Sequence, residues 1–369
     1  MNIGFDGKRT TQNLTGLGNY SRYIIRLLAK FYPEHKYTIY ALKPPSQNLK
    51  LSGVEYQYPS QKRFKLYWRS RGIINDLLKH EIKLFHGLSN EIPSGLKKAQ
   101  IRSVVTIHDL IFLRYPQYYA FFDRIIYNLK FRHAARNADK VIAISHQTKN
   151  DLIQFFGIEK DRISVIYQNC DPIFHQIAPQ TSRKEIAGKH QLPSKYILSV
   201  GTIEERKNLM VIVKALTKLE NVHLVVVGRK TAYKKQVEHF IDVNKLSGRV
   251  HFLQNVAHDE LPAIYQQAEL FIYPSRFEGF GIPIIEALYS GIPVIAATGS
   301  CLEEAGGPGS IYVNPDDDTD LAQQILTVLE NGEKRNNMVS AGKLHLEKFE
   351  DKKIAADIMQ LYQNVIDNA

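Results

Sequence analysis

Short apolar runs alternate with helical stretches along almost the whole chain, and this alternation restricts the fold more than any other feature. In the first half, runs rich in β-branched and aliphatic residues are expected as strands, at Tyr37–Tyr40, Val104–Ile107, Lys140–Ile144 and Ile163–Tyr167. Stretches between them, Gly18–Lys30 and Tyr118–Arg136 among them, are expected as helices. Strands that are apolar on both faces predict a parallel sheet covered by helices on each side.

The second half repeats this order. Its expected strands are Tyr196–Val200, Val222–Val227, Val250–Phe252, Leu270–Tyr273 and Pro293–Ala296. Its expected helices are Asn208–Lys218, Lys234–Lys245, Asp259–Ala268 and Pro283–Ser290. Two such halves in series predict an α/β protein made of two Rossmann-like domains, each with a parallel sheet.

Proline residues mark the expected boundary between the two domains. Pro172, Pro179 and Pro193 punctuate a polar stretch that lacks strand periodicity. The chain has 369 residues, which is enough for two domains of roughly 150 residues each. The predicted parts are a first domain, a linker, a second domain and a final helix, over residues 1–172, 173–194, 195–350 and 351–369.

Positive charge is concentrated in the first half. Residues 1–172 carry 27 Lys and Arg against 13 Asp and Glu, whereas residues 173–369 carry 21 against 24. The run Lys62–Arg71 interleaves cations with aromatic side chains, which suits an anionic partner such as lipid headgroups, a phosphorylated substrate or nucleic acid. A solvated helix face explains this single run equally well, but it does not explain the imbalance across the whole half.

Cysteine content and hydropathy bear on the compartment. The two cysteines, Cys170 and Cys301, favour a reducing compartment over a disulfide-bonded secreted scaffold. The chain starts without the basic and apolar segments of a signal peptide. Its apolar runs are far shorter than the roughly 20 residues of a membrane span. We therefore expect a cytoplasmic protein.

The segment from Phe271 to Ala296 carries the strongest chemical signal. A buried strand is expected to run into a turn that contains Gly279 and Gly281, and a helix is expected to open near Pro283. The free N–H groups and partial positive charge of a helix N-terminus favour a phosphate group at this point.

Two carboxylates bracket this turn, Glu278 before it and Glu286 in the helix. They cannot both serve phosphates because like charges repel, whereas a carboxylate can accept two hydrogen bonds from the diol of a sugar. A tight turn before a helix would explain Glu286 alone, since acidic residues favour helix N-termini. It does not explain Glu278, so we predict a site that combines phosphate and sugar recognition.

This segment resembles the donor-binding signature of the retaining glycosyltransferases of family four. Its pattern is Glu278-x7-Glu286 within Phe-Glu-Gly-Phe-Gly-Ile-Pro, followed by Glu-Ala-Leu-x-x-Gly-Ile-Pro-Val. Three further segments resemble motifs of the family, Gly201–Leu209 with its Arg-Lys-Asn turn, Leu224–Gly228 and Thr106–Leu110. The resemblance covers nearly the whole chain. It implies the GT-B fold, in which two Rossmann-like domains face each other across a cleft and the final helix packs back on the first domain.

The resemblance also implies roles for individual residues. Glu286 is expected on the ribose and Glu278 on the sugar hydroxyls, while Arg206 and Lys207 are expected to stabilise the departing diphosphate. His108 is expected near the reacting carbon of the sugar, and it joins Glu278, Arg206 and Lys207 as a catalytic candidate. The expected donor-binding residues are Gly16, Gly228, Asn255, Val256, Gly279, Phe280, Gly281, Ile282 and Glu286.

The implied activity is the transfer of a hexose from a nucleotide-diphosphate sugar, with retention and without a metal ion or other cofactor. The segment that contains His108 is similar to that of bacterial O-antigen and capsule mannosyltransferases, which favours mannose and a glycan or lipid-linked acceptor. The basic first half suits a protein that rests on the anionic inner face of a membrane. The triplet Asp316–Asp318 resembles an acidic metal cluster, but its place before a helix favours N-capping.

Other classes of protein remain open. A sugar-nucleotide epimerase of the same architecture would convert its donor without any acceptor. A basic nucleic-acid-binding protein would explain the charge of residues 1–172 but would leave Glu278 and Glu286 without a purpose, so we expect no nucleic-acid partner. A nicotinamide dehydrogenase is the least favoured, because Thr10–Tyr20 contains no complete Gly-x-Gly-x-x-Gly loop.

Overall fold

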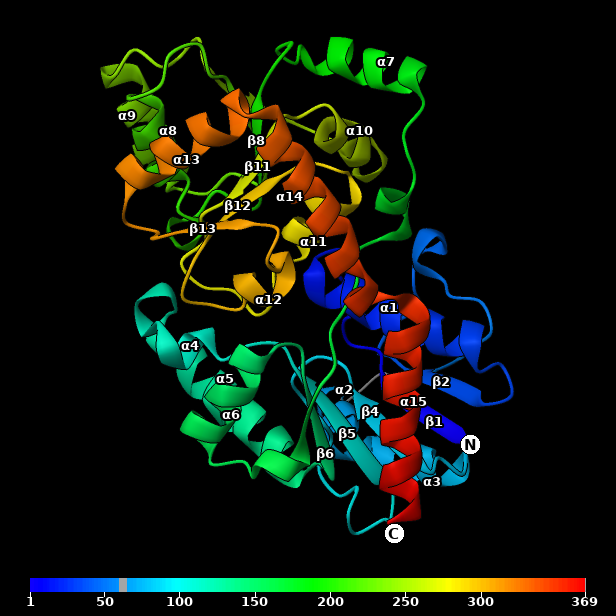
Figure 1. Ribbon diagram of the computed structural model, residues 1–369. Helices are drawn as coiled ribbons and strands as arrows, with labels where there is room; N and C mark the ends of the chain where they lie inside the picture. Colours follow the sequence, from blue (N-terminus) through cyan, green and yellow to red (C-terminus); the bar gives the residue numbers. More distant parts are fainter. Residues whose placement is uncertain (60–64, 369) are drawn as a thin grey trace. The chain divides into compact units, whose positions relative to one another are not determined.

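The computed structural model describes residues 1–59 and 65–368, which form two compact units (Figure 1). Unit 1 comprises Met1–Gln168 and Phe349–Ala369, and unit 2 comprises Asn169–Lys348. Of the basic run that was expected to meet an anionic partner, Lys62, Arg63 and Phe64 lie outside the described residues. Within the described ranges, no helix is both long and apolar enough to cross a membrane.

In the described part of unit 1, seven parallel strands form one sheet in the order β3-β2-β1-β4-β5-β6-β7. The strands are β1 Asn2–Asp6, β2 Lys36–Tyr40, β3 Glu55–Gln57, β4 Leu84–Gly87, β5 Arg102–Ile107, β6 Lys140–Ala143 and β7 Ile163–Val165. After β1 the chain builds outward through β2 and β3, and it then returns to the other side of β1 with β4. The point where the strand order reverses therefore lies between β1 and β4.

Helices cover this sheet. They are α1 Gly16–Phe31, α2 Lys65–Tyr67, α3 Ile73–Lys79, α4 Ile111–Arg114, α5 Phe121–Asn137, α6 His146–Phe156 and α15 Asp351–Asp367, with a π-helical turn at Trp68–Gly72. The final helix α15 packs against α1 and β5 of the same unit. Its buried residues Ile354, Ile358, Leu361 and Tyr362 follow the helical spacing seen in the sequence.

In the described part of unit 2, six parallel strands form a second sheet in the order β10-β9-β8-β11-β12-β13. The strands are β8 Ile197–Val200, β9 Leu224–Val227, β10 Val250–Leu253, β11 Leu270–Tyr273, β12 Val294–Ala297 and β13 Ile311–Val313. Here the order reverses between β8 and β11. Together the two sheets confirm the predicted fold class.

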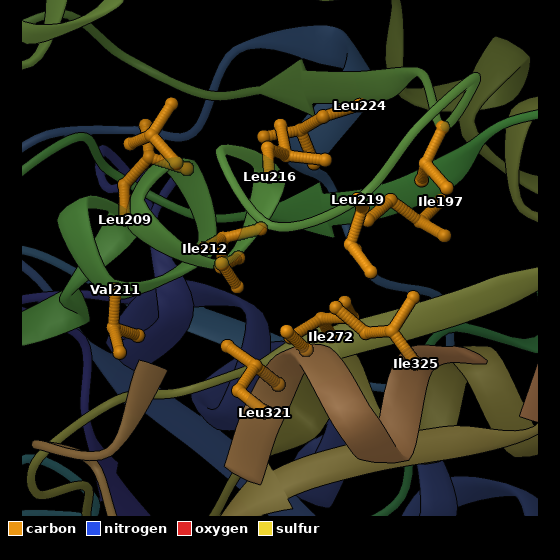
Figure 2. Close-up of a cluster of buried hydrophobic side chains, with 14 of the residues drawn as sticks. Ile197, Leu209, Val211, Ile212, Leu216, Leu219, Leu224, Ile272, Leu321 and Ile325 are labelled. Carbon is orange, nitrogen blue, oxygen red and sulfur yellow. The ribbon is translucent and has the colours of Figure 1, made fainter. Parts of the chain in front are cut away.

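The helices of unit 2 enclose its core. They are α7 Gln180–His190, α8 Leu209–Leu216, α9 Lys234–Val243, α10 Leu261–Gln266, α11 Ile282–Tyr289, α12 Leu302–Gly306, α13 Asp318–Glu330 and α14 Gly332–His345. The core cluster contains Ile212 and Leu216 of α8, Ile272 of β11 and Leu321 and Ile325 of α13 (Figure 2). These aliphatic side chains fix α8 against the sheet, and with it the loop that precedes α8.

Short 3-10 turns complete both units, at Gln47–Leu49, Pro116–Tyr118, Lys160–Arg162, Pro172–His175, Glu205–Lys207, His258–Glu260 and Leu346–Phe349. The segment 173–194, which was expected to be a linker, instead belongs to unit 2 and contains α7. Pro179 stands at the N-cap of this helix, where a proline interrupts no helical hydrogen bond. Ile186 is buried, and α7 packs against α10.

Candidate active site

The residues with the strongest sequence signal meet where the strand order of unit 2 reverses. Arg206 and Lys207 follow β8, and Glu278 follows the neighbouring strand β11. The Oε1 atom of Glu278 lies 2.5 Å from Nζ of Lys207 and 2.9 Å from Nη1 of Arg206. Ligands of open parallel sheets bind beyond the carboxyl ends of the strands at such a reversal. The structure therefore brings three of the predicted catalytic residues together at the expected edge.

Glu278 is held by more groups than the sequence predicted. Ser275 Oγ and the Tyr273 hydroxyl also donate to its Oε1, at 2.5 and 3.2 Å. Burial alone would raise the pKa of Glu278, but Lys207 and Arg206 overcome this and hold the pKa at about 2. Among the described residues, every polar contact of this carboxylate reaches Oε1, so Oε2 is left to accept from a ligand.

Arg206 is fixed in place as a permanent cation. Its Nη1 donates to the Phe277 carbonyl oxygen at 2.5 Å, and its Nη2 pairs with Glu204 at 2.7 Å. Burial would lower the pKa of Arg206, but the carboxylates of Glu278 and Glu204 raise it above the ordinary value. Only 15% of this side chain is exposed, so its partners in the protein, rather than water, surround the charged group.

The glycine turn leads directly into α11. Gly281 stands at the N-cap with φ of 122°, a conformation that favours glycine, and an added Cβ would lie 3.0 Å from Leu302 Cδ2. Cys301 Sγ donates to the carbonyl oxygens of Glu278 and Phe280, at 3.0 and 3.1 Å. This thiol ties the turn to α12. In the first turn of α11, Pro283 has no N–H and the N–H of Ile284 donates to the Gly281 carbonyl oxygen at 2.9 Å. The N–H of Ile282 has no partner within the helix and suits a phosphate.

Glu286 belongs to a different group of contacts. Its Oε2 accepts a hydrogen bond from the Tyr265 hydroxyl at 2.8 Å. Burial raises the pKa of Glu286 to about 7, even though Tyr265 and His258 act in the opposite direction. Among the described residues, no hydrogen bond or ion pair joins Glu286 to Glu278, Arg206 or Lys207. The structure thus places the two glutamates in different electrostatic environments.

The residues predicted near the nucleoside base follow β9 and β10. A Cβ on Gly228 would lie 1.8 Å from the carbonyl oxygen of Gly201, so the loops after β8 and β9 touch backbone to backbone. Asn255 is exposed and has φ of 52°, in the left-handed region, and Val256 beside it is half-buried. Their role in binding a base stays a prediction.

His108 lies in unit 1, directly after β5. Its Nε2 donates to the Leu88 carbonyl oxygen at 2.9 Å, since a carbonyl can only accept. Burial lowers the pKa of His108 to about 4, so the ring is neutral at physiological pH and Nδ1 is an acceptor. The ring packs edge-on against Tyr20, with centroids 4.6 Å apart. This orientation is set by unit 1 alone.

Gly16 is the first residue of α1, and a Cβ there would meet nothing within 4 Å. Its neighbour Gly18 is the constrained glycine, because a Cβ there would lie 1.9 Å from the Asn13 carbonyl oxygen. Gly16 was predicted as a donor contact, whereas Gly18 was predicted only as the start of a helix. Gly16 as a donor contact therefore stays a prediction without steric support.

The acidic triplet before α13 has structural partners. Asp317 caps the helix, since its Oδ1 accepts from the backbone N–H groups of Thr319 and Asp320 at 3.0 and 2.8 Å. Asp316 pairs with Arg276 at 2.6 Å, and Asp318 pairs with Lys218. The capping interpretation is confirmed for Asp317.

Three residues of the site were missed by sequence reasoning. Tyr273 and Ser275 contact Glu278, and Tyr265 contacts Glu286. Tyr273 and Ser275 flank the end of β11, so the rule that strand ends carry function could have identified them. No comparable signal marks Tyr265, which lies in the preceding helix α10.

Comparison with known proteins places both units in one class of enzyme. The sequence model described as Glycosyltransferase Family 4 matches residues 14–172, and the one described as Glycosyl transferases group 1 matches residues 182–345. O-antigen chain mannosyltransferase B of Escherichia coli is 27% identical over 273 residues, covering 72% of this chain and 70% of that protein. O-antigen chain mannosyltransferase RfbU of Salmonella typhimurium is 27% identical over 225 residues, covering 61% and 60%.

Solved structures agree on the fold. Anabaena HepE in complex with UDP-glucose matches with a TM-score of 0.78 and 19% identity, over 99% of this chain and 100% of that chain. A sucrose-phosphate synthase from Thermosynechococcus elongatus matches with a TM-score of 0.81 and 20% identity, over 100% of both chains. Since glycosyltransferase models match both units and the structural neighbours match over nearly the whole chain, this chain belongs to the glycosyltransferases of group 1 and family 4 and has their GT-B fold.

Proposed function

We propose that this glycosyltransferase moves a hexose from a nucleotide-diphosphate sugar to a glycan or lipid-linked acceptor, with retention of configuration and without a metal ion. The observation that carries the proposal is the cluster in unit 2 where Lys207 and Arg206 hold one oxygen of Glu278. The names of the two mannosyltransferase relatives support mannose as the sugar. The UDP-glucose held by HepE supports a nucleotide-sugar donor.

The two cations supply what the leaving group needs. When the bond between sugar and diphosphate breaks, negative charge grows on the departing phosphate oxygen. Lys207 and Arg206 both contact Glu278. This contact does not use all of their donors, because a lysine has three N–H donors and an arginine has five. Donors therefore remain for a diphosphate without loss of the ion pairs that position them.

The two glutamates are suited to hydroxyl groups in different ways. Glu278 stays ionised, because its pKa is about 2, and its Oε2 can accept from a sugar hydroxyl. Glu286 has a pKa of about 7, so near neutral pH it is protonated part of the time. A hydroxyl of a ribose that donates to Glu286 would favour its ionised form and lower that pKa.

We explain the retention of anomeric configuration by attack on the same face of the sugar from which the diphosphate leaves. The acceptor hydroxyl attacks the anomeric carbon from the side of the leaving diphosphate, whose oxygen takes the hydroxyl proton. We assign this proton to the phosphate rather than to His108, because a pKa of about 4 makes the imidazole a weak base. A hydroxyl of the transferred sugar instead donates a hydrogen bond to Nδ1 of His108.

A panel of nucleotide sugars tests the proposal. Thermal unfolding of the purified protein is measured with GDP-mannose, UDP-glucose and related donors, and the stabilising donor is then incubated with a short mannoside acceptor. We expect transfer in the presence of EDTA and a product with the donor's anomeric configuration by NMR. Conversion of the donor without any acceptor would favour an epimerase, and the absence of stabilisation by any donor would contradict the proposal.

We also propose that the protein works in the cytoplasm at an anionic membrane surface. The excess of 27 Lys and Arg over 13 Asp and Glu in residues 1–172 supports this. Co-sedimentation is measured with vesicles of phosphatidylcholine and increasing phosphatidylglycerol. Binding is expected to rise with the anionic lipid and to fall with salt, and equal binding to pure phosphatidylcholine would contradict the proposal.

A further inference from the structure

Unit 1 contains a cavity of about 510 Å³ that is separate from His108. It lies beyond the carboxyl ends of β1 and β4, the neighbouring strands between which the order of the sheet reverses. Asp6 at the end of β1, Glu91 after β4, Arg69 in the π-helical turn and Lys130 on α5 all line it. This is the position where an open parallel sheet binds its ligand.

Positive charge converges on one carboxylate in this cavity. Nζ of Lys8 lies 2.7 Å and Nζ of Lys130 3.5 Å from Oε1 of Glu91, and Arg69 pairs with Oε2 of the same group. Nε of Arg9, next in sequence to Lys8, is buried and has no hydrogen-bond partner among the described residues. Glu91 alone cannot neutralise these cations.

Asp6 adds a second carboxylate, which accepts from the backbone N–H of Lys8 at 3.1 Å and from Ser89 Oγ at 3.2 Å and whose charge acts to raise the pKa of Lys8. Together with Glu91 it still faces four cations, namely Lys8, Arg9, Arg69 and Lys130. Burial and the charge of Arg69 lower the pKa of Lys8 to about 8. Burial, Arg69 and Arg9 likewise lower the pKa of Lys130. Clustered, partly buried cations are costly to maintain unless an anion joins them.

Apolar side chains form another part of the cavity, alongside Ser70, Ser94 and His133. Ile73, Phe85 and Ile92 form part of its wall, and the rim carries Tyr67 and Leu129, whose side chains are 60% and 66% exposed. Leu129 continues a row of exposed apolar residues along α5, which comprises Phe121, Phe122, Ile125 and Ile126. An occupant that matches this arrangement has an anionic group and an apolar chain in one molecule.

We propose that this cavity binds a phosphate or diphosphate group attached to an apolar chain, with the lining residues Arg69 and Lys130 on the anion and Leu129 on the chain, while Lys8 adds positive charge through its ion pair with Glu91. The inference rests on the proposed function, in which such a molecule carries the acceptor saccharide. It deepens that function by naming the residues of unit 1 that would hold the acceptor's anionic link. No bond is made or broken in this cavity, which serves for binding only.

Farnesyl diphosphate is the probe for the test. Its binding to the full chain is measured by calorimetry in a Lys207→Ala background, which weakens the competing site of unit 2 by removing one of its two cations. We expect farnesyl diphosphate to bind at least tenfold more tightly than inorganic pyrophosphate, and farnesol to bind weakly. Equal affinity for pyrophosphate and farnesyl diphosphate would overturn the apolar part of the proposal and point to a site for free diphosphate.

Two variants with opposite expected effects separate a binding site from a structural ion-pair network. Lys130→Ala is expected to weaken farnesyl diphosphate binding about tenfold, since it removes one of the cations facing the anion. Glu91→Gln is expected to strengthen binding severalfold, because it removes the carboxylate that competes for the same cations. Lys36→Ala, at an exposed position on β2, is the matched control and is expected to change nothing.

Thermal unfolding of each variant establishes that it is folded. Donor binding by the chain with Lys207 intact, measured separately, establishes whether the proposed function holds in unit 2. If the donor binds but farnesyl diphosphate does not, or if it binds equally well to wild type, Lys130→Ala and Glu91→Gln, the inference fails while the proposed function stands. If the donor does not bind, the proposed function fails whatever the cavity binds.

Discussion

Nζ of Lys207 lies 2.5 Å from Oε1 of Glu278, although 71 positions separate the two residues in the sequence. The pairing of β8 with β11 brings them together, because each residue follows one of these neighbouring strands. The contact therefore depends on the strand order of the sheet, and a change in either residue is expected to act on the other.

Replacing Glu278 tests the centre of the site. Glu278→Gln keeps the shape of the side chain but removes the charge that Lys207 and Arg206 hold in place. Turnover is expected to fall by roughly 100-fold, since the change removes the carboxylate that we propose to contact the reacting sugar. Affinity for the nucleoside diphosphate, measured by calorimetry, is expected to stay within a few fold. Glu204→Gln, which affects only the outer partner of Arg206, is the control, and unchanged turnover in Glu278→Gln would remove Glu278 from the site.

Glu286 makes stability depend on pH in a particular direction. Its pKa is raised from 4.5 to about 7 in the folded chain, so the folded protein binds this proton more tightly than the unfolded chain does. The contribution of Glu286 to the free energy of unfolding is fully present below about pH 4.5 and is lost as the pH rises through 7. The loss amounts to at most about 3 kcal/mol above pH 7.

Glu286→Gln is expected to remove this dependence. The stability of the variant relative to the wild type, measured by urea unfolding, is therefore expected to increase as the pH is raised from 6 to 9. Donor binding by the variant is expected to weaken, since an amide oxygen accepts from a ribose hydroxyl less strongly than a carboxylate. Parallel unfolding curves for the two proteins at every pH would show that the raised pKa is not present.

A side chain at position 228 tests the contact between the loops after β8 and β9. In Gly228→Ala the new Cβ would overlap the Gly201 carbonyl oxygen, so both loops must separate. A loss of about 1–3 kcal/mol in unfolding free energy is expected, together with loss of donor binding. Gly248→Ala is the matched control, because a Cβ there meets nothing within 4 Å. Equal stability of the two variants would contradict the close approach.

Removing the buried hydroxyl of Tyr362 tests how α15 is held within unit 1. It lies 2.5 Å from Nδ1 of His86, whose Nε2 is 2.9 Å from Thr106 Oγ1. Tyr362→Phe leaves a fully buried imidazole nitrogen without this partner, at an expected cost of about 1–3 kcal/mol in chemical unfolding. The exposed Tyr67 gives the control Tyr67→Phe, which is expected to change stability by less than about 0.5 kcal/mol. A neutral result for Tyr362→Phe would mean that water replaces the hydroxyl.

Most strands were predictable because they are short apolar runs bounded by polar or turn residues. The strands β1, β3, β4 and β13 were not among the expected ones, and β3 (Glu-Tyr-Gln) contains no apolar run. The expected strand Leu270–Tyr273 coincides with β11, and Tyr196–Val200 differs from β8 by one residue. The helix α7 was missed because its apolar residues are few and three prolines surround it, which a linker would show equally well. The local sequence pattern predicts helices and strands, but it does not distinguish a polar surface helix from a polar connection.

The partners within the site were harder to predict than its central residues. Glu278 and Lys207 could be named from motifs, whereas Ser275 and Tyr273 become partners of Glu278 through the conformation of the turn after β11, which the motif does not specify. The charge state of Glu286 could not be predicted from the sequence either, because its burial in the folded chain sets its pKa. Contacts of this kind depend on packing between segments that are distant in the chain.

The division of the chain between the units has a consequence for biosynthesis. Unit 1 is assembled from two separate stretches, and the second of these, which contains α15, is translated only after the whole of unit 2. While the ribosome is still making residues 169–348, His86 therefore lacks the Tyr362 hydroxyl as a partner, and α15 does not yet cover the surface of α1. The first half of the gene is read first, but the corresponding half of the protein is the last to be finished.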